Sequence, residues 1–288
     1  MQTRMSAVAK RHDTRKVILI TGCSSGIGRA LAIGLPKNRY RVFASVRKPS
    51  DLGKLKNHQL EPLLLDLNDS QSIQVAINEL LERTEGEFYG LINNAAYGQP
   101  GAVEDLPRET LKQQFETNVF GTQELTNLCI KALRQHNQGR IIQISSILGR
   151  ICLANRGAYN ASKFALEALT DTMRLELHGS GIHLSLVEPG PITSNFRLNA
   201  LQALHKNIQM DTSVHRVHYE NVLGRLTGSK PVPFSQPASS LVPVVKHALE
   251  SRRPKIRYPV TIPTYVLPNL KRILTDKWMD WVLRKVGD

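Results

Sequence analysis

Short apolar runs recur along this chain, and each is bounded by glycine, proline, asparagine or aspartate. The runs cover residues 17–20, 41–46, 62–65, 88–92, 140–144 and 182–187. Helical patterns lie between them, and residues 255–258 are a candidate for a last strand. Strands that are apolar throughout and alternate with helices are typical of a parallel sheet covered on both faces. The sequence therefore predicts a doubly wound, Rossmann-type α/β fold of about seven strands.

The rhythm of strands and helices predicts a single domain over 16–288, after a basic and disordered N-terminal extension over 1–15. Of the 288 residues, 41% are hydrophobic and 22% are charged, which suits a large globular domain. The stretch 193–235 interrupts the rhythm. An interruption of that length is typical of a flap over a substrate site.

The formal net charge of +14 is concentrated at the two ends. Residues 1–16 hold five Lys and Arg against one Asp, and residues 252–288 hold nine against three. We expect no nucleic-acid binding, because no recognition helix, aromatic RNA platform or zinc spacing accompanies the charge. Basic ends instead favour contact with anionic membrane or with a phosphorylated cofactor.

The cysteines and the N-terminus indicate the compartment. Cys23, Cys129 and Cys152 are scattered and lack C-x-x-C spacing, which favours a reducing compartment and argues against a disulfide framework or a zinc site. The first 16 residues lack the apolar core of a signal peptide, and the run at 17–20 is too short to span a bilayer. We therefore expect a cytoplasmic protein with no metal, and membrane association only through its basic ends.

A glycine-rich turn, TGCSSGIG at 21–28, joins the first predicted strand to a helix. Glycine permits a sharp turn and a close approach to a pyrophosphate, whose charge is met by the free N–H groups of the helix. With a strand before it and a helix after it, the turn predicts dinucleotide binding. The expected contacts are Gly22, Ser24, Ser25, Gly26, Ile27 and Gly28.

The end of the second predicted strand indicates which dinucleotide binds. An acidic residue there would bind the adenosine ribose of NAD, but Val46 takes that place and Arg47 follows. A guanidinium can bind a 2′-phosphate with two hydrogen bonds, so Arg47 favours NADP(H) over NAD. The alternative is a solvated basic residue at a strand end. Asp66, with Leu67 beside it, is a candidate for the adenine amino group or a cap of its own loop.

Tyr159 and Lys163 lie four residues apart in AYNASKFALEALTD (158–171), a stretch of good helix formers. On a helix they share one face, about one turn apart. Such pairs occur by chance in many helices. The spacing alone leaves open whether this one is a surface contact or a proton-transfer pair.

Five motifs in order resemble the short-chain dehydrogenase/reductase family. They are TGCSSGIG (21–28), NNAA (93–96), TNVFG (117–121), QISSILG (143–149) and YNASK (159–163). The resemblance covers about 16–191, and its details look like the bacterial NADP-dependent aldehyde reductases and the 17β-hydroxysteroid and retinol dehydrogenases. One departure is Ala96, where the family usually has glycine.

The resemblance implies roles for four residues. Tyr159 is the general acid/base, and Lys163 lowers the pKa of the phenol and binds the nicotinamide ribose. Ser146 hydrogen-bonds the substrate oxygen where negative charge grows, and Asn118 holds a water that links Lys163 to a proton relay. Adjacent strand residues point to opposite faces, so only one of Ser145 and Ser146 can face the substrate, and the family spacing selects Ser146.

The family pattern also implies further cofactor contacts. These are Asn94, Ala95, Tyr159, Lys163, Pro189, Gly190, Ile192 and Thr193. The expected activity is the NADP(H)-dependent interconversion of an alcohol and a carbonyl, in the direction of reducing a hydrophobic aldehyde or ketone. Tyr97, Leu148 and Leu153 are candidates for the pocket wall. The alternative is a catalytically idle NADP-binding sensor or scaffold, and by analogy we expect a homodimer or homotetramer.

The C-terminal run LPNLKRILTDKWMDWVLRKV (267–286) has apolar residues at helical spacing, two tryptophans and five basic residues. It predicts an amphipathic tail over about 264–288. Two placements are open: the tail docks on the protein and closes the substrate pocket, or it rests on anionic lipid.

Overall fold

The computed structural model describes residues 13–56, 58–228 and 232–287. Most of the predicted N-terminal extension therefore lies outside the described residues. The centre is a parallel sheet of seven strands in the order β3-β2-β1-β4-β5-β6-β9. The strands are β1 Lys16–Ile20, β2 Tyr40–Val46, β3 Glu61–Leu64, β4 Gly90–Asn93, β5 Gly139–Ile144, β6 Ile182–Glu188 and β9 Arg257–Pro259. The predicted fold class is confirmed.

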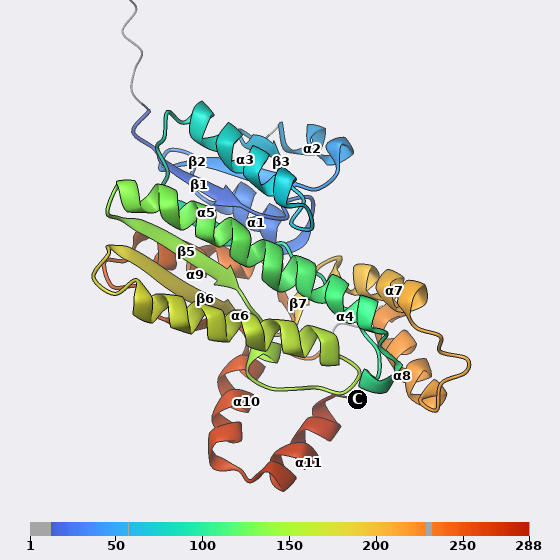
Figure 1. The fold of residues 1–288 in the computed structure, drawn as a ribbon. Coiled ribbons are helices and arrows are strands. Elements are labelled where there is room, and N and C mark those ends of the chain that lie inside the picture. The colour runs from blue at the N-terminus through green and yellow to red at the C-terminus, as the bar shows by residue number, and fades with distance from the viewer. Residues whose placement is uncertain (1–12, 57, 229–231, 288) are drawn as a thin grey trace, which may run out of the picture.

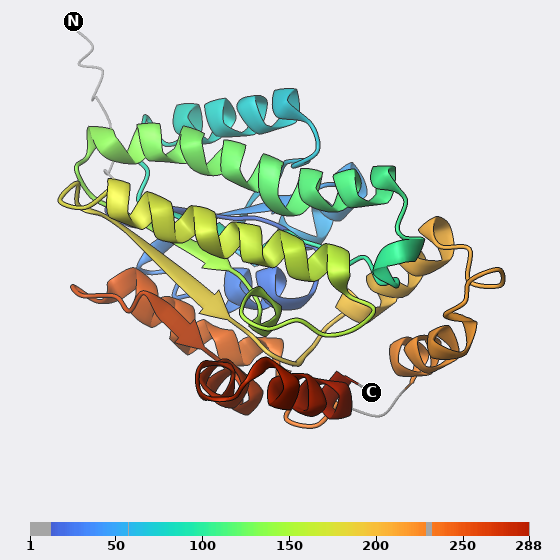
Figure 2. The same cartoon turned by 60° about the horizontal axis from the view of Figure 1, so that its bottom comes forward.

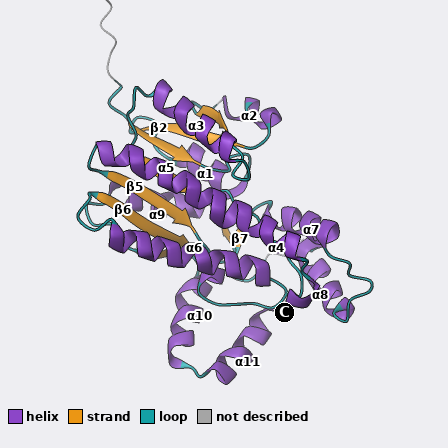
Figure 3. Ribbon diagram, viewed as in Figure 1, coloured by secondary structure: helices purple, strands orange, loops and turns teal. Residues whose placement is uncertain are grey.

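Helices cover both faces of the sheet (Figures 1 and 3). On one face lie α3 (Ser70–Arg83), α5 (Thr122–Gln135) and α6 (Gly157–Glu176), and on the other lie α1 (Gly26–Gly34) and α9 (Leu241–Glu250). Alternate residues of a strand pack against the helices on opposite faces of the sheet. In β1, for example, Leu19 packs under the first set and Ile18 under the second. This double burial explains why the strands are apolar throughout.

The remaining helices lie beyond the carboxyl end of the sheet. The stretch predicted as a flap forms α7 (Phe196–Asn207) and α8 (Arg216–Thr227), with β7 (Ile192–Thr193) and β8 (Gln236–Pro237) paired at its ends. The flap helices share an apolar cluster with Ala102, Leu106 and Ala158. A short α2 (Gly53–Lys56) follows β2, and α4 (Arg108–Phe115) runs through a π-helical turn, Glu116–Gly121, into α5.

The chain ends in two helices, α10 (Ile262–Ile273) and α11 (Asp276–Gly287), which form a hairpin outside the sheet layers (Figures 1 and 2). Each has twelve residues. Within the described ranges, no helix combines the length and the apolar character needed to cross a bilayer.

Candidate active site

The predicted site residues meet at one edge of the sheet, because parallel strands end on the same side. The glycine turn follows β1, Asn94 follows β4, Ser146 follows β5 and Pro189 follows β6. Helix α6 crosses this edge and contacts the turn after β5. The edge therefore gathers segments that are more than 160 residues apart in the chain.

The glycine turn is built so closely that side chains do not fit. Gly22 and Gly26 have φ values of +72° and +58°, in the left-handed region that favours glycine. A Cβ on Gly28 would lie 2.3 Å from the Gly22 carbonyl oxygen, and one on Gly22 would lie 2.9 Å from the Cα of Ala95. The backbone thus forms a cradle at the start of α1. This cradle fits the pyrophosphate of a dinucleotide.

Thr21, which the sequence reasoning did not single out, fastens this turn to the end of β4. Its buried hydroxyl oxygen accepts hydrogen bonds from the backbone N–H groups of Asn94 and Ala95, both at 2.9 Å. The Asn94 side chain donates in return to the carbonyls of Thr21 at 2.8 Å and Gly22 at 3.2 Å. The signal that could have found Thr21 was its place between β1 and Gly22.

The other residues of the turn divide between the surface and the core. Ser24 is exposed, Ser25 precedes α1 as its N-cap residue, and Ile27 packs against the core. Cys23 is fully buried, and burial raises the pKa of its thiol. Cys23 is therefore a packing residue and not a nucleophile.

The segment after β6 passes the glycine turn. The Pro189 carbonyl accepts a hydrogen bond from Ile147 N–H at 2.9 Å, and Gly190 is pressed against Thr261 so closely that a Cβ would lie 2.1 Å from its hydroxyl. Ile192 and Thr193 form β7. Next to them, the Cβ of Ser194 lies 3.3 Å from where Gly26 would carry one. The predicted contacts of this segment therefore lie beside the cradle.

The residues predicted at the adenosine end have different surroundings. Arg47 follows β2, is exposed, and forms no ion pair within the described ranges. Asp66 accepts a hydrogen bond from Asn68 N–H at 3.0 Å, so its carboxylate caps its own loop, which was the alternative reading. Leu67 is buried in the core and packs against Gly121.

Tyr159, Ser146 and Lys163 come together on the substrate side of α6. The Ser146 hydroxyl is hydrogen-bonded to the Tyr159 phenol. Lys163 is buried; its Nζ donates to the Ile144 carbonyl at 2.8 Å and lies 5.8 Å from the centroid of the Tyr159 ring. The helix places the ammonium below the ring, and the strand end before Ser146 fixes it there.

The protein shifts the pKa of both groups away from ionisation. Burial raises the pKa of Tyr159 to about 12, and the hydrogen bond from Ser146 only partly opposes this. Burial lowers the pKa of Lys163 to about 8, against the charge of Glu167, which raises it. The sequence-based expectation that Lys163 would leave the phenol with a lowered pKa is not met by the protein's own groups. The phenol is a proton donor at neutral pH.

Asn118 lies in the π-helical turn between α4 and α5. Its Nδ2 donates to the Tyr97 carbonyl at 3.0 Å and to the Ser162 hydroxyl at 3.1 Å, and its Oδ1 accepts from Tyr97 N–H at 3.2 Å. Both amide protons are therefore used within the protein. A water in the predicted relay would have to bind the remaining lone pair or the main-chain carbonyl.

A buried group of charges behind Lys163 was not predicted. Glu167, one turn after Lys163, pairs with Arg257 of β9, which also binds Glu188 at 2.9 Å and pairs with Asp171. Ser145 faces this group rather than the substrate, since its hydroxyl and the Glu167 carboxylate both border Gly149. The two adjacent serines thus point to opposite sides, as strand geometry requires. No local pattern in the sequence indicates this pairing, because Arg257 is 90 residues from Glu167.

Apolar side chains surround the Tyr159 ring. Phe196, the first residue of α7, lies edge-on to it with centroids 5.4 Å apart, and Gly98 leaves room for that ring, since a Cβ there would lie 2.7 Å from Phe196. Leu148 and Leu153 belong to the same apolar cluster as Tyr159 and the inner sides of α10 and α11. Two of the three predicted wall residues, Leu148 and Leu153, therefore pack in the same cluster as Tyr159. Gly98 was not predicted.

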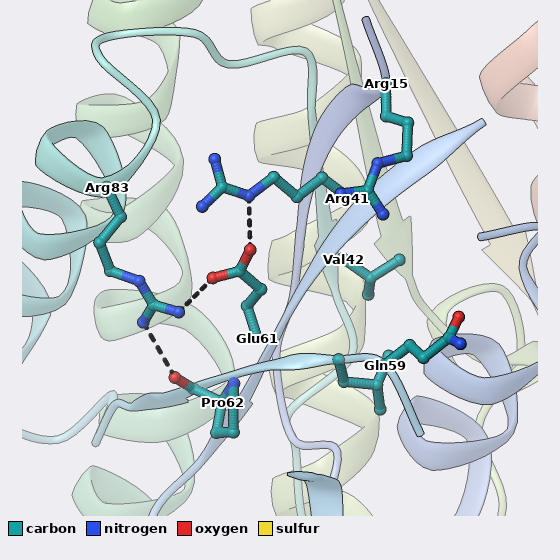
Figure 4. Close-up of a pocket in the computed structure, with 8 residues that line it drawn as sticks. Arg15, Arg41, Val42, Gln59, Glu61, Pro62 and Arg83 are labelled. Carbon is teal, nitrogen blue, oxygen red and sulfur yellow. Dashed lines mark hydrogen bonds and ion pairs between the residues drawn. The ribbon is translucent and has the colours of Figure 1, made fainter. Parts of the chain in front are cut away.

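A hollow of about 400 Å³ lies elsewhere, at the amino ends of β2 and β3. Figure 4 shows Arg41 and Arg83 on either side of Glu61 within it. Arg41 binds Glu61 at 2.5 Å, Arg83 pairs with the other carboxylate oxygen, and Arg15 binds Asp13. The guanidinium charges are thus largely neutralised, and the hollow is on the wrong edge of the sheet to join the Tyr159 chemistry.

Metal ligands do not gather in the part of the chain that the structure describes: no group of three His, Cys, Asp or Glu side chains is placed to hold an ion. Ala96 does not have a positive φ, so its methyl group needs no strained backbone at the position where the resemblance expects glycine.

Comparison with known proteins agrees with this geometry. The family model for short chain dehydrogenases matches residues 16–205, and the chain belongs to this family. It is 38% identical to the uncharacterized oxidoreductase YbbO of Escherichia coli over 270 residues, covering 94% of each protein. It is 33% identical to human retinol dehydrogenase 5, covering 93% of this chain and 89% of that protein. The predicted family, with its retinol dehydrogenase branch, is confirmed.

Solved structures show the same fold. A short-chain dehydrogenase from Streptomyces avermitilis superposes with a TM-score of 0.74 at 26% identity, covering 95% of this chain and 98% of that one. A family member from Burkholderia phymatum, solved in complex with NAD, gives a TM-score of 0.76 at 19% identity, over 92% of this chain and 96% of its own. The chain is therefore an oxidoreductase of a family that uses NAD(P)(H) on CH–OH and C=O groups.

Proposed function

We propose that this protein is an NADP(H)-dependent reductase of a hydrophobic aldehyde or ketone, with Tyr159 as the general acid. The observation that carries the proposal is the placement of Tyr159, which lies with Ser146 and Lys163 among apolar side chains and whose pKa burial raises to about 12. Carbonyl reduction needs a proton at the oxygen that receives charge. A phenol with a pKa of about 12 can supply it.

In this mechanism a bound nicotinamide would supply the hydride. The protein's own residues would bind the carbonyl oxygen of the substrate and give it a proton. Ser146 donates a hydrogen bond to the carbonyl oxygen, where charge grows as the hydride arrives. Tyr159 gives that oxygen its proton, and the Lys163 ammonium stabilises the phenolate that forms. Asn118 holds the Tyr97 and Ser162 segments in place around α6, and the main chain beside it is where we place the relay water.

The choice of NADP(H) rests on Arg47. Arg47 is exposed at the carboxyl end of β2. The Asp66 carboxylate accepts a hydrogen bond within its own loop. A free guanidinium at that position suits a 2′-phosphate. We keep the cofactor contacts predicted from the sequence as part of this proposal, Asp66 among them, with Asn94 and Ala95 also holding the turn and Leu67 acting through the core.

The direct test is Tyr159→Phe. The variant keeps the ring but loses the proton, so we expect kcat for NADPH-dependent reduction to fall on the order of 10²–10⁴-fold while NADPH binding stays unchanged. The adjacent serines give a matched pair: Ser146→Ala should lower kcat, and Ser145→Ala should lower it far less. A Tyr159→Phe variant with wild-type turnover would reject the mechanism.

Arg47→Asp tests the cofactor. Losing a charge-assisted contact should raise the KM for NADPH about 10–100-fold relative to that for NADH. Arg39→Asp makes the same charge change before the opposite end of β2 and should leave the ratio unchanged. If Arg47→Asp also leaves it unchanged, Arg47 does not bind the phosphate.

A catalytically idle NADP-binding sensor is the second candidate, and NADPH binding without turnover of any aldehyde, ketosteroid, retinal or quinone would favour it. For quaternary structure we propose a homodimer or homotetramer through α5 and α6, because Leu169 and Leu175 are exposed on α6 and Phe120 is exposed in the π-helical turn just before α5. We propose a cytoplasmic location, since the three cysteines are free.

A further inference from the structure

The C-terminal hairpin has two apolar sides, and only one of them is covered. On the inner side, Met279 of α11 and Leu267 of α10 are buried against Leu148 and Ile151. Val282 and Leu283 pack there as well, so the spacing 279, 282, 283 defines the docked stripe of α11. The inner side therefore docks on the protein, which was one of the two placements left open by the sequence, and it packs in the cluster that includes Tyr159.

The outer side exposes large apolar side chains. Trp278 and Trp281 are 62% and 49% exposed, and Ile273, at the tip of the hairpin, is 81% exposed. The two indole rings lie edge-to-face with centroids 6.4 Å apart. A lone exposed apolar residue needs no explanation, but two neighbouring tryptophans with an isoleucine do.

Cations share this outer side. Trp278, Trp281 and Lys285 follow one helical stripe, and Lys277, Trp281 and Arg284 follow the next. Lys285 lies 4.2 Å from the centroid of the Trp281 ring. None of the three cations forms an ion pair within the described ranges, whereas Asp276 and Asp280 lie toward the other flank of the helix.

We propose that this outer face, formed by Ile273, Trp278 and Trp281 with Lys277, Arg284 and Lys285, docks the protein on an anionic lipid bilayer. Indole rings are stable at the boundary between headgroups and acyl chains, and lysine and arginine beside them bind anionic headgroups. The helices are too short to span a bilayer, so the attachment is peripheral.

The charges favour lipid over other occupants. A second copy of the chain would place this face on itself in a two-fold contact and bring Lys277, Arg284 and Lys285 against their own copies. Nucleic acid would satisfy the cations but offers nothing to the Ile273 side chain. An anionic bilayer satisfies the cations and the apolar groups together. Docked in this way, the hairpin would hold its inner side, and with it the apolar cluster around Tyr159, close to the apolar phase.

The chain offers a direct probe, because its only two tryptophans both lie on this face. Full-length protein is mixed with vesicles of phosphatidylcholine alone or with phosphatidylglycerol added. We expect the emission to shift to shorter wavelength and the protein to co-sediment only with the anionic vesicles, with binding that weakens as salt rises. Unchanged emission together with no co-sedimentation would overturn the proposal.

Variants of the outer face define the contact. Lys277→Gln/Arg284→Gln/Lys285→Gln should weaken vesicle binding on the order of 100-fold, and Trp278→Ser/Trp281→Ser by at least about tenfold. Val75→Ser and Val217→Ser remove exposed apolar groups from α3 and α8 and should bind like the wild type. Equal binding by all variants would overturn the proposal. Outer-face variants are better suited to this test than truncation at Pro268, which would also remove the docked side.

Two further outcomes would show that the outer face binds a partner other than an anionic bilayer. An emission shift that depends on protein concentration without lipid would mean a second copy covers it, and displacement of vesicles by duplex DNA or RNA at equal charge concentration would mean a general polyanion site. Turnover of a water-soluble carbonyl by Trp278→Ser/Trp281→Ser should equal that of the wild type. Lipid binding and catalysis can therefore fail independently.

Discussion

The glycine turn and the C-terminal hairpin both border the region around Tyr159, but they are held in place differently. The turn is fixed by backbone contacts so close that a single added carbon at Gly28 would lie 2.3 Å from a carbonyl oxygen. The hairpin is held by apolar side chains on one stripe of each helix, and its other side exposes two tryptophans. Few residue types can replace the glycines of the turn, whereas many apolar residues could fill the docked stripe of the hairpin.

This difference matches the division of labour in the site. Because every substrate would need the same cofactor, the backbone of the glycine turn has to keep one conformation. The apolar surroundings of Tyr159, which we propose as the substrate pocket, come from Phe196, Leu148 and the hairpin, and these side-chain contacts can change without disturbing the sheet. Chemistry therefore rests on the rigid half of the site and specificity on the adaptable half.

Gly28→Ala would test the rigidity of the cradle, and we expect the largest effect of these three changes. The new Cβ must displace the Gly22 carbonyl or the Asn94 amide, at a cost of about 1–3 kcal/mol. Cofactor affinity should fall by up to about 100-fold, measured by NADPH fluorescence titration. Gly224→Ala in α8 is the control, because a Cβ there meets nothing within 4 Å. It should bind NADPH normally and raise the melting temperature slightly. Normal NADPH binding by Gly28→Ala would show that the cradle can yield.

Met279→Ala would test the docked side of the hairpin. Truncating this buried side chain should weaken the packing of α11 by about 2 kcal/mol or more. We expect faster hydrogen exchange in α11 and a KM for a hydrophobic carbonyl that rises about tenfold, with NADPH affinity unchanged. Trp278→Ala, one residue away, removes a larger but exposed side chain and should leave exchange in α11 unaltered. Similar exchange in both variants would mean that the hairpin is not held by its inner stripe.

Glu167→Gln should have the smallest effect, a shift in pH dependence. Burial has lowered the pKa of Lys163 to about 8, and the charge of Glu167 opposes that lowering. Lys163 is charged below its pKa and loses its proton as the pH rises through that value. Removing the Glu167 charge should lower the pKa further, so kcat/KM for reduction should begin to fall at a lower pH than in the wild type.

Asp171→Asn provides the comparison for that shift. Asp171 also pairs with Arg257 but is not among the charges that act on Lys163. Its pH profile should match that of the wild type. If both variants shift equally, the cause is the disturbance of Arg257 and not the charge next to Lys163.

Much of the fold was predictable because its signals are local. A run of apolar residues bounded by turn formers specifies a buried strand whatever lies elsewhere, and all seven predicted strands are present with boundaries that differ by two residues or fewer at each end. The choice of Ser146 over Ser145 also followed from strand geometry and the family spacing, and the structure places these serines on opposite sides.

Other features depended on partners distant in the chain. The place of Thr21 before Gly22 could mark it as part of the turn but not reveal that it binds the backbone 73 residues later, and no residue near Glu167 indicates its pairing with Arg257. The pKa of Tyr159 was expected to be lowered by Lys163, which lies beside it in the sequence. In the structure the burial of the phenol, to which several segments contribute, is the larger effect.

The sequence by itself determined the sheet and the glycine turn and singled out the side chains that we propose as reacting groups, because periodicity, glycine spacing and residue type act within a few positions. Only the tertiary structure decided the protonation of Tyr159 and Lys163, the use of Asp66 and Asn118 as local ties, and the two-sided role of the C-terminal hairpin. Those properties come from desolvation and from contacts between distant segments, which exist only once the chain is packed.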